Sequence, residues 1–145
     1  MSSHQTQSSQ QTQQLATDFL SQLTDGAVVA LVGELGSGKT TFVQGLGQAL
    51  GLSRITSPTY NIVKHYSLPQ PHGQIANLVH IDLYRLSGPE EARSFDLREI
   101  FSQPHDLVVV EWAEKAAQLL PHPHYLINFK NLGGDQRQID IKLVS

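Results

Sequence analysis

GELGSGKT, residues 33–40, fits the pattern G-x-x-x-x-G-K-S/T at every fixed position. This is the phosphate-binding P-loop pattern, in which glycines without a Cβ atom let the backbone turn successive N–H groups toward a polyanion. In such a loop Lys39 would reach the β- and γ-phosphates, and the hydroxyl of Thr40 would ligate Mg²⁺. The helix that begins there would add the positive end of its dipole. The stretch therefore predicts a site for a nucleotide with magnesium.

The flanking sequence supplies the strand and the helix between which a P-loop is expected. Residues 27–32, AVVALV, form the short apolar, β-branched run that is typical of a buried parallel strand. Residues 41–50 place apolar side chains at helical spacing, and Gly51 is a natural helix stop. A plain strand-turn-helix corner needs neither a lysine nor a hydroxyl after its last glycine. The flanks therefore favour the phosphate-binding interpretation.

Composition limits the class of protein. The chain has 145 residues, which predicts one domain and is short for a nucleotide kinase with separate lid and substrate domains. Ten Lys and Arg against 13 Asp and Glu, with a formal charge of −3, argue against strong independent binding of nucleic acid. The lack of Cys excludes a disulfide framework and a cysteine zinc site. With short apolar runs and a polar start, we expect a cytoplasmic protein without membrane contact.

The N-terminal pattern predicts a disordered tail at residues 1–11 and a P-loop ATPase domain at residues 12–145. The tail is rich in Gln and Ser and has no apolar side chain to bury after its first residue. From about Thr12, apolar residues recur at helical spacing until Asp25-Gly26 ends the helix. This helix leads directly into the strand before the P-loop.

The rest of the chain predicts further strands, turns and one helix. The predicted elements are antiparallel strands at 58–66 and 76–84 with a turn at 68–73, a helix from 88 toward Leu97, a buried strand at 107–112, and a hairpin of strands at 125–130 and 138–143. Together they predict a small α/β domain of the P-loop NTPase type. Its central sheet should be mixed, with parallel core strands, antiparallel hairpins and helices on both faces.

Two acids are candidates for the magnesium side of the site. A P-loop that hydrolyses a nucleotide needs an acid at the end of a buried strand, across from Thr40, to hold the metal or its water shell. Glu111 ends the apolar run 108–110, and Asp82 lies within an apolar strand where an unpaired carboxylate would be costly to bury. One acid would bind the metal, and the other would position the attacking water or reach the metal through water. The residues leave open which acid does which.

Four motifs follow one another along the chain: GELGSGKTTF at 33–42, SPTYNIV at 57–63, HIDLYRL at 80–86 and VVVEW at 108–112. Their succession resembles the TsaE family, also called YjeE, from about Thr12 to Arg137. That family consists of small P-loop ATPases that support bacterial synthesis of threonylcarbamoyladenosine in tRNA, beside the anticodon, with the transferase pair TsaD and TsaB. The resemblance implies ATP and Mg²⁺ as cofactors and a TsaD–TsaB-like complex as partner. It implies contact with tRNA only indirectly, through that complex.

Position by position, the resemblance also implies site residues. Those that would bind the nucleotide are Thr12, Gly36, Ser37, Gly38, Lys39, Thr40, Thr41 and Arg137, with Thr12 near the base. Thr40 and Glu111 would bind Mg²⁺, and the catalytic residues would be Lys39, Asp82 and Glu111. Residues 57–60 and 80–86 match two switch-like segments, and Trp112 matches a tryptophan beside the metal-binding acid. The chain would act as a slow ATPase that regulates transferase turnover, stimulated by its partner.

One departure from the family and two other classes of protein complete the interpretation. Asp96 stands where the family usually has glycine, and aspartate tolerates a positive φ better than most residues if the turn requires one. A small-molecule kinase is the alternative function, although the arginines are scattered rather than gathered in a lid segment. A GTP-dependent switch would carry an N-K-x-D motif, which does not occur, so ATP is favoured over GTP.

Overall fold

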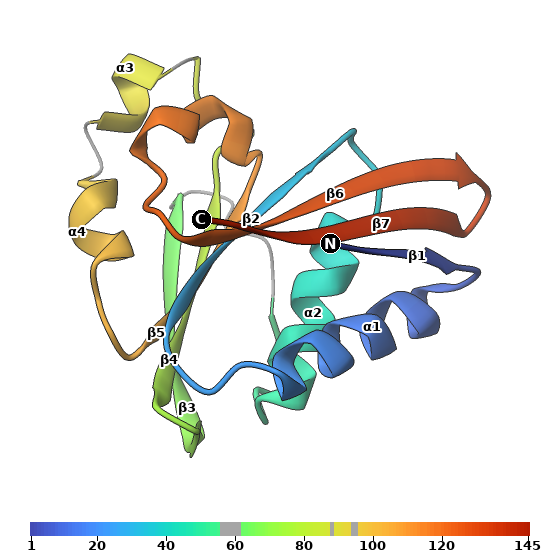
Figure 1. The fold of residues 1–145 in the computed structure, drawn as a ribbon, viewed down its shortest axis with the longest axis horizontal. Coiled ribbons are helices and arrows are strands. Elements are labelled where there is room, and N and C mark those ends of the chain that lie inside the picture. The colour runs from blue at the N-terminus through green and yellow to red at the C-terminus, as the bar shows by residue number, and fades with distance from the viewer. Residues whose placement is uncertain (56–61, 88, 94–95) are drawn as a thin grey trace.

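A seven-stranded sheet forms the middle layer of the computed structural model, which describes residues 1–55, 62–87, 89–93 and 96–145 (Figure 1). In spatial order its strands are β1 (Ser2–Thr6), β7 (Gln136–Val144), β6 (His124–Gly133), β2 (Ala27–Gly33), β5 (Asp106–Glu111), β4 (Ile75–Asp82) and β3 (Val63–His72). The central strands β6, β2, β5 and β4 run parallel, and the outer strands pair antiparallel with their neighbours. The predicted α/β class with a mixed sheet is confirmed.

Helices cover both faces of the sheet, as predicted. They are α1 (Ser9–Ser21), α2 (Lys39–Ala49), α3 (Pro89–Ala92), α4 (Leu97–Phe101) and the 3₁₀ helix η2 (Ala113–Leu119). α1 and α2 pack on the face to which Val29 and Leu31 point, whereas α3, α4 and η2 pack on the face of Val28 and Ala30. Within the described ranges, no helix is both long and apolar enough to cross a membrane.

The two elements that flank the P-loop agree closely with the prediction. β2 begins at Ala27, as expected from its apolar run. α2 begins at Lys39, two residues before the predicted start at 41. Gly51 follows its last turn at φ +83°, the left-handed conformation that commonly ends helices.

The first eleven residues differ from the predicted disordered tail. Ser2–Thr6 form β1, an edge strand that pairs antiparallel with β7, and α1 begins at Ser9 rather than near Thr12. The hydroxyl of Ser8 accepts the N–H of Gln11 and so caps the helix. Main-chain hydrogen bonds to a partner strand can order a segment that has no apolar side chains, and a search for buried residues does not detect them.

The turn between β3 and β4 is shorter than predicted. β3 extends to His72, so Pro69 and Pro71 lie in a strand at the edge of the sheet, where proline is tolerated. The chain reverses at Gly73, whose φ is +60° and where an added Cβ would lie 2.4 Å from the carbonyl oxygen of Thr24. Residues 58–61 of the predicted strand lie outside the described residues.

The helix predicted from residue 88 toward Leu97 is instead two short helices, α3 and α4. Asp96 immediately precedes α4 at φ +52° and ψ +44°, in the left-handed region. The turn therefore does have the positive φ that glycine adopts freely and that aspartate tolerates.

Candidate nucleotide-binding site

A cavity of about 410 Å³ opens at the carboxyl ends of β2, β4 and β5, the edge where ligands bind in open α/β sheets. Its lining residues are Leu35, Gly36, Ser37, Gly38, Lys39, Thr40, Thr41, Asp82, Tyr84, Glu111, Trp112 and Arg137. The structure thus brings the P-loop, both candidate acids and Arg137 to one place. Of the predicted site residues, Thr12 does not line it.

The P-loop has the backbone that its glycines permit. Gly36 lies at φ +75° and Gly38 at φ +105°, conformations that side chains with a Cβ atom rarely adopt. Gly38 is the N-cap of α2, and among the described residues no side chain caps this helix end. The N–H groups of the first turn of α2 are therefore free of a side-chain acceptor, which suits the binding of an anion.

Lys39 is a buried cation that rests on the loop from which it comes. Its side chain is 4 % exposed, and Nζ donates to the main-chain oxygens of Gly33 and Glu34, the latter at 3.2 Å. The ammonium also lies 3.8 Å from the centre of the Trp112 ring. Burial lowers the pKa of Lys39, and the charge of Glu111 is the largest influence that opposes this shift. Such a lysine would gain from a phosphate close by.

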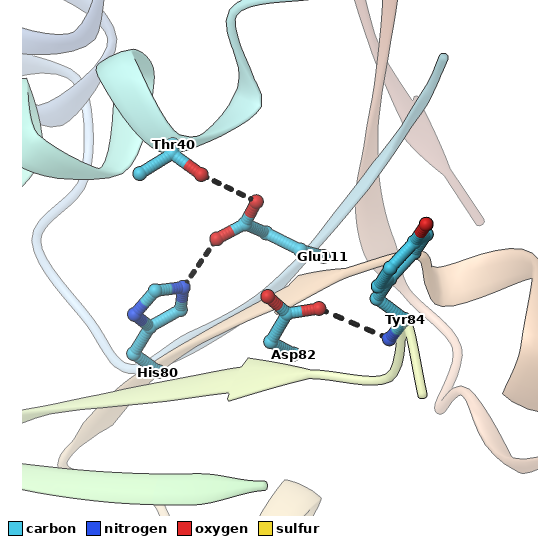
Figure 2. A network of polar contacts seen from close by, with 5 residues as sticks. All are labelled: Thr40, His80, Asp82, Tyr84 and Glu111. Carbon is cyan, nitrogen blue, oxygen red and sulfur yellow. Dashed lines mark hydrogen bonds and ion pairs between the residues drawn. The ribbon is translucent and has the colours of Figure 1, made fainter. Parts of the chain in front are cut away.

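Glu111 is the acid that faces Thr40 (Figure 2). It is 2 % exposed, its Oε1 accepts the Thr40 hydroxyl at 3.0 Å, and its Oε2 lies 2.5 Å from Nε2 of His80. Strand alternation explains the arrangement, because Leu107 and Val109 point toward α2 and Glu111 follows at the same spacing. Glu111 is therefore a buried, doubly hydrogen-bonded carboxylate at the base of the cavity.

Asp82 lies beside Glu111, but its carboxylate has a different hydrogen-bond partner. The two residues are register partners in the parallel pair β4–β5. Oδ1 of Asp82 accepts the main-chain N–H of Tyr84 at 3.0 Å, which closes a turn just after β4. Burial raises the pKa of Asp82, the Tyr84 hydrogen bond lowers it, and the charge of Glu111 raises it further. Asp82 is thus a partly buried acid that lines the cavity without contacting Thr40.

Arg137 closes one side of the cavity from the β6–β7 hairpin. Its Nη2 donates to the carbonyl of Gly36 at 3.0 Å, and its Nη1 donates to the side-chain oxygen of Asn131 at 3.1 Å. Thr12 lies farther back on α1, 2 % exposed, with its hydroxyl 2.8 Å from that of Thr6. Thr6 is the register partner of Arg137, so the threonine pair lies beside that strand position, and neither threonine lines the cavity.

Sequence reasoning did not single out three features of this site. His80 is fully buried beneath Glu111. The rings of Tyr84 and Trp112 pack at a tilt of 45° with their centres 5.0 Å apart, and Trp112 has a φ of +58°, which is rare for a bulky residue. Lys115 donates to the main-chain oxygens of Tyr84 and Leu86. The sequence does place Trp112 beside the metal-binding acid and a histidine at a core-facing position of a buried strand, but not the contacts that these residues make.

The residues present fit a magnesium ion. Mg²⁺ prefers oxygen ligands in an octahedron, for which adjacent ligands about 2.1 Å from the metal lie about 2.9 Å apart. The hydroxyl of Thr40 and Oε1 of Glu111 are separated by 3.0 Å. In the described part of the chain, no three His, Cys, Asp or Glu side chains form a metal cage. Mg²⁺ in proteins is usually held by one or two carboxylates, with substrate phosphates and water completing the shell.

The sheet, the loop and the cavity define a P-loop protein of the α/β class with a candidate nucleotide site. The family model described as threonylcarbamoyl adenosine biosynthesis protein TsaE matches residues 6–139. The chain belongs to the TsaE family. The match includes Thr6 of β1, so it begins before the stretch over which the sequence motifs predicted the resemblance.

Individual relatives agree with this assignment. The TsaE protein of Bacillus subtilis is 37 % identical over 120 residues, which cover 82 % of this chain and 71 % of that protein. The TsaE protein of a Nostoc species is 40 % identical over 127 residues, which cover 82 % and 72 % of the two chains. The crystal structure of Bacillus subtilis YdiB superposes with a TM-score of 0.78 at 31 % identity, covering 99 % of this chain and 86 % of that one.

Proposed function

We propose that this chain binds ATP with Mg²⁺, hydrolyses it to ADP and phosphate, and thereby regulates the turnover of a TsaD–TsaB-like transferase complex in the cytoplasm. That complex would make threonylcarbamoyladenosine in tRNA, next to the anticodon. The observation that best supports the proposal is the single cavity in which Lys39, the Thr40–Glu111 pair and Asp82 meet. Membership of the TsaE family supports the biosynthetic role.

The proposed chemistry needs positioning and charge rather than a covalent intermediate. Lys39 would exchange the carbonyls of Gly33 and Glu34 for the β- and γ-phosphate oxygens. Thr40 and Glu111 would hold Mg²⁺, which when bound neutralises the charge that develops on the phosphates. Asp82 would orient the attacking water, because it lies beside Glu111 and its raised pKa favours acceptance of a proton.

The regulatory step would use the segment that follows β4. Asp82 binds the N–H of Tyr84, and Lys115 binds the carbonyls of Tyr84 and Leu86, so the cavity wall is linked to that segment. Tyr84 is 49 % exposed and could be contacted by a partner. Ordering of this segment by the γ-phosphate, and its release after hydrolysis, would change affinity for the transferase. The other switch-like segment, residues 57–60, lies outside the described residues.

Phosphate release tests the proposal. The purified chain should hydrolyse ATP slowly with Mg²⁺, and addition of a TsaD–TsaB pair should raise the rate. The formal charge of −3 supports contact with tRNA through the complex, so tRNA alone should leave the rate unchanged. An unchanged rate with TsaD–TsaB, together with the absence of a stable complex, would count against the regulatory role.

The alternative of a small-molecule kinase makes a different prediction about the γ-phosphate. A hydrolase releases ADP and inorganic phosphate in equal amounts without an added acceptor. A kinase would need a metabolite acceptor and would form a phosphorylated product. Screening metabolites for phosphoryl acceptance therefore separates the two functions of the same P-loop.

A further inference from the structure

His80 lies one layer behind the residues that line the nucleotide cavity. It belongs to β4, two residues before Asp82, and its side chain is fully buried. Nε2 lies 2.5 Å from Oε2 of Glu111 (Figure 2). A carboxylate can only accept, so the ring nitrogen is the donor, and hydrogen bonds to charged groups are shorter than those between neutral groups.

The other ring nitrogen argues that His80 does more than fill the core. Within the described residues, Nδ1 is buried and has no hydrogen-bond partner. An unsatisfied buried polar atom costs free energy, so an apolar side chain of similar size would suit the core better. The hydrogen bond that the His80 side chain does make goes to Glu111. We therefore relate the role of His80 to its effect on Glu111.

Glu111 requires such a donor because it is only 2 % exposed. A carboxylate that deep needs a partner at each oxygen. Thr40 serves Oε1 and His80 serves Oε2. Once the Thr40 hydroxyl and Oε1 of Glu111 bind a metal ion, their mutual hydrogen bond is lost. The hydrogen bond from His80 to Oε2 then still fixes the plane of the carboxylate.

We propose that His80 is a positioning residue that holds Glu111 with Oε1 toward Thr40, and so sets the affinity of the site for Mg²⁺. The inference rests on the proposed function, because it assumes that Mg²⁺ binds with the nucleotide at Thr40 and Glu111. Partners of metal ligands typically alter metal affinity about 10- to 100-fold. His80 is not among the residues that line the cavity, so binding of the nucleotide without metal should not change.

Titration of the protein with ADP, by calorimetry in EDTA and at a series of Mg²⁺ concentrations, tests the proposal. His80→Gln can place an amide donor near the position of Nε2, whereas the amide of His80→Asn is one methylene shorter. We expect His80→Asn to raise the Mg²⁺ concentration that gives half-maximal enhancement of ADP binding about 10- to 100-fold. Its ADP affinity in EDTA should equal that of the wild type. His80→Gln should retain most of the wild-type response to Mg²⁺.

A variant without a donor and a control make the test independent of folding. His80→Met lacks a donor but keeps an apolar volume suited to the core, so it replaces His80→Asn if that variant does not fold. Leu78→Ala changes a fully buried residue on the same face of β4 and should lower Tm without altering the response to Mg²⁺. A general loosening of β4 would affect Leu78→Ala as well, whereas loss of positioning would not.

Two results would overturn the inference. One is a wild-type response to Mg²⁺ in His80→Asn and in His80→Met. The other is an equal loss of ADP affinity in EDTA and in Mg²⁺, which would indicate a structural role. Failure of the proposed function would look different, because the wild-type protein itself would then bind no ADP, or bind it equally well with and without Mg²⁺. That result removes the metal site and the inference with it.

Discussion

The two walls of the nucleotide cavity are built in different ways. One wall is the P-loop, a continuous segment whose geometry depends on glycines and on the start of α2. The other wall consists of side chains at the ends of β4 and β5, two strands separated in the sequence by α3 and α4. The first wall depends on local backbone conformation, and the second depends on strand register and on which face each residue points to. Substitutions should therefore affect the two walls in different ways.

The largest effect should follow the loss of the one cation that the P-loop itself contributes to the cavity. We expect Lys39→Ala to reduce ATP hydrolysis about 1,000-fold, because Lys39 supplies the positive charge with which this wall stabilises the transferring phosphate. Burial lowers the pKa of Lys39, so its charged form is less favourable in the folded protein than in the unfolded chain. The variant should accordingly be no less stable than the wild type in thermal unfolding.

Lys142→Ala is the charge-matched control, because Lys142 is exposed on β7. It should hydrolyse ATP at the wild-type rate. Substantial activity in Lys39→Ala would contradict the assignment of this loop as the phosphate-binding wall.

The second wall should separate catalysis from binding. Asp82→Asn should lower the hydrolysis rate about 100-fold, because an amide cannot accept the proton of an attacking water. Binding of ADP with Mg²⁺ should change little, because Glu111 rather than Asp82 contacts Thr40. Single-turnover hydrolysis and ADP titration measure the two quantities. If Asp82→Asn instead weakens the response to Mg²⁺, the two acids have exchanged the roles proposed for them.

The same contrast explains how much could be predicted from the sequence. The P-loop, its strand and its helix follow from a motif whose parts are adjacent in the chain. Glu111 and Asp82 could be found as acids in apolar strands, but which of them faces Thr40 depends on side-chain directions at the sheet edge. The partnership of His80 with Glu111 depends on the β4–β5 register, which links distant residues.

Outside the cavity, predictions failed where structure depends on pairing rather than burial. β1 is polar and gains its order from main-chain bonds to β7, so a search for apolar periodicity assigned it to a tail. The sequence of residues 68–73 predicts a turn, but Pro69 and Pro71 lie in the edge strand β3, which accommodates them. The role predicted for Thr12 at the nucleotide base stays a prediction, since Thr12 is buried and does not line the cavity.

A glycine substitution should change the first wall by a moderate amount. Gly38 lies at φ +105° at the N-cap of α2, so Gly38→Ala adds strain of about 1 to 3 kcal/mol. An added Cβ would lie 3.7 Å from the Arg137 side chain, which is ordinary contact, so the strain is in the backbone. We expect ADP affinity in EDTA to fall about tenfold. Gly47→Ala, on the same helix and against Ile55, is the comparison, and it should lower Tm without a selective loss of ADP affinity.

The smallest effect concerns Asp82 of the second wall and the pH dependence of the folded protein's stability in the absence of ligand. Burial raises the pKa of Asp82 above its value in the unfolded chain. At a pH well below the pKa of Asp82 in the unfolded chain, Asp82 is protonated in both states and contributes nothing to the pH dependence of stability. As pH rises through the interval between the two pKa values, the unfolded state ionises first, so the folded state loses stability, and this loss levels off above the folded pKa.

Asp82→Asn cannot ionise, yet its side-chain oxygen can still accept the N–H of Tyr84. We therefore expect its Tm in EDTA to match that of the wild type at acid pH and to exceed it by about 1 to 3 °C at pH 7 to 8. Thermal unfolding of both proteins from pH 4 to 8 measures the difference. A Tm difference that shrinks as pH rises would mean that the ionised carboxylate stabilises the fold. In that case burial would not disfavour the ionised form of Asp82. The reason for proposing Asp82 as the acceptor of a proton from water would then no longer hold.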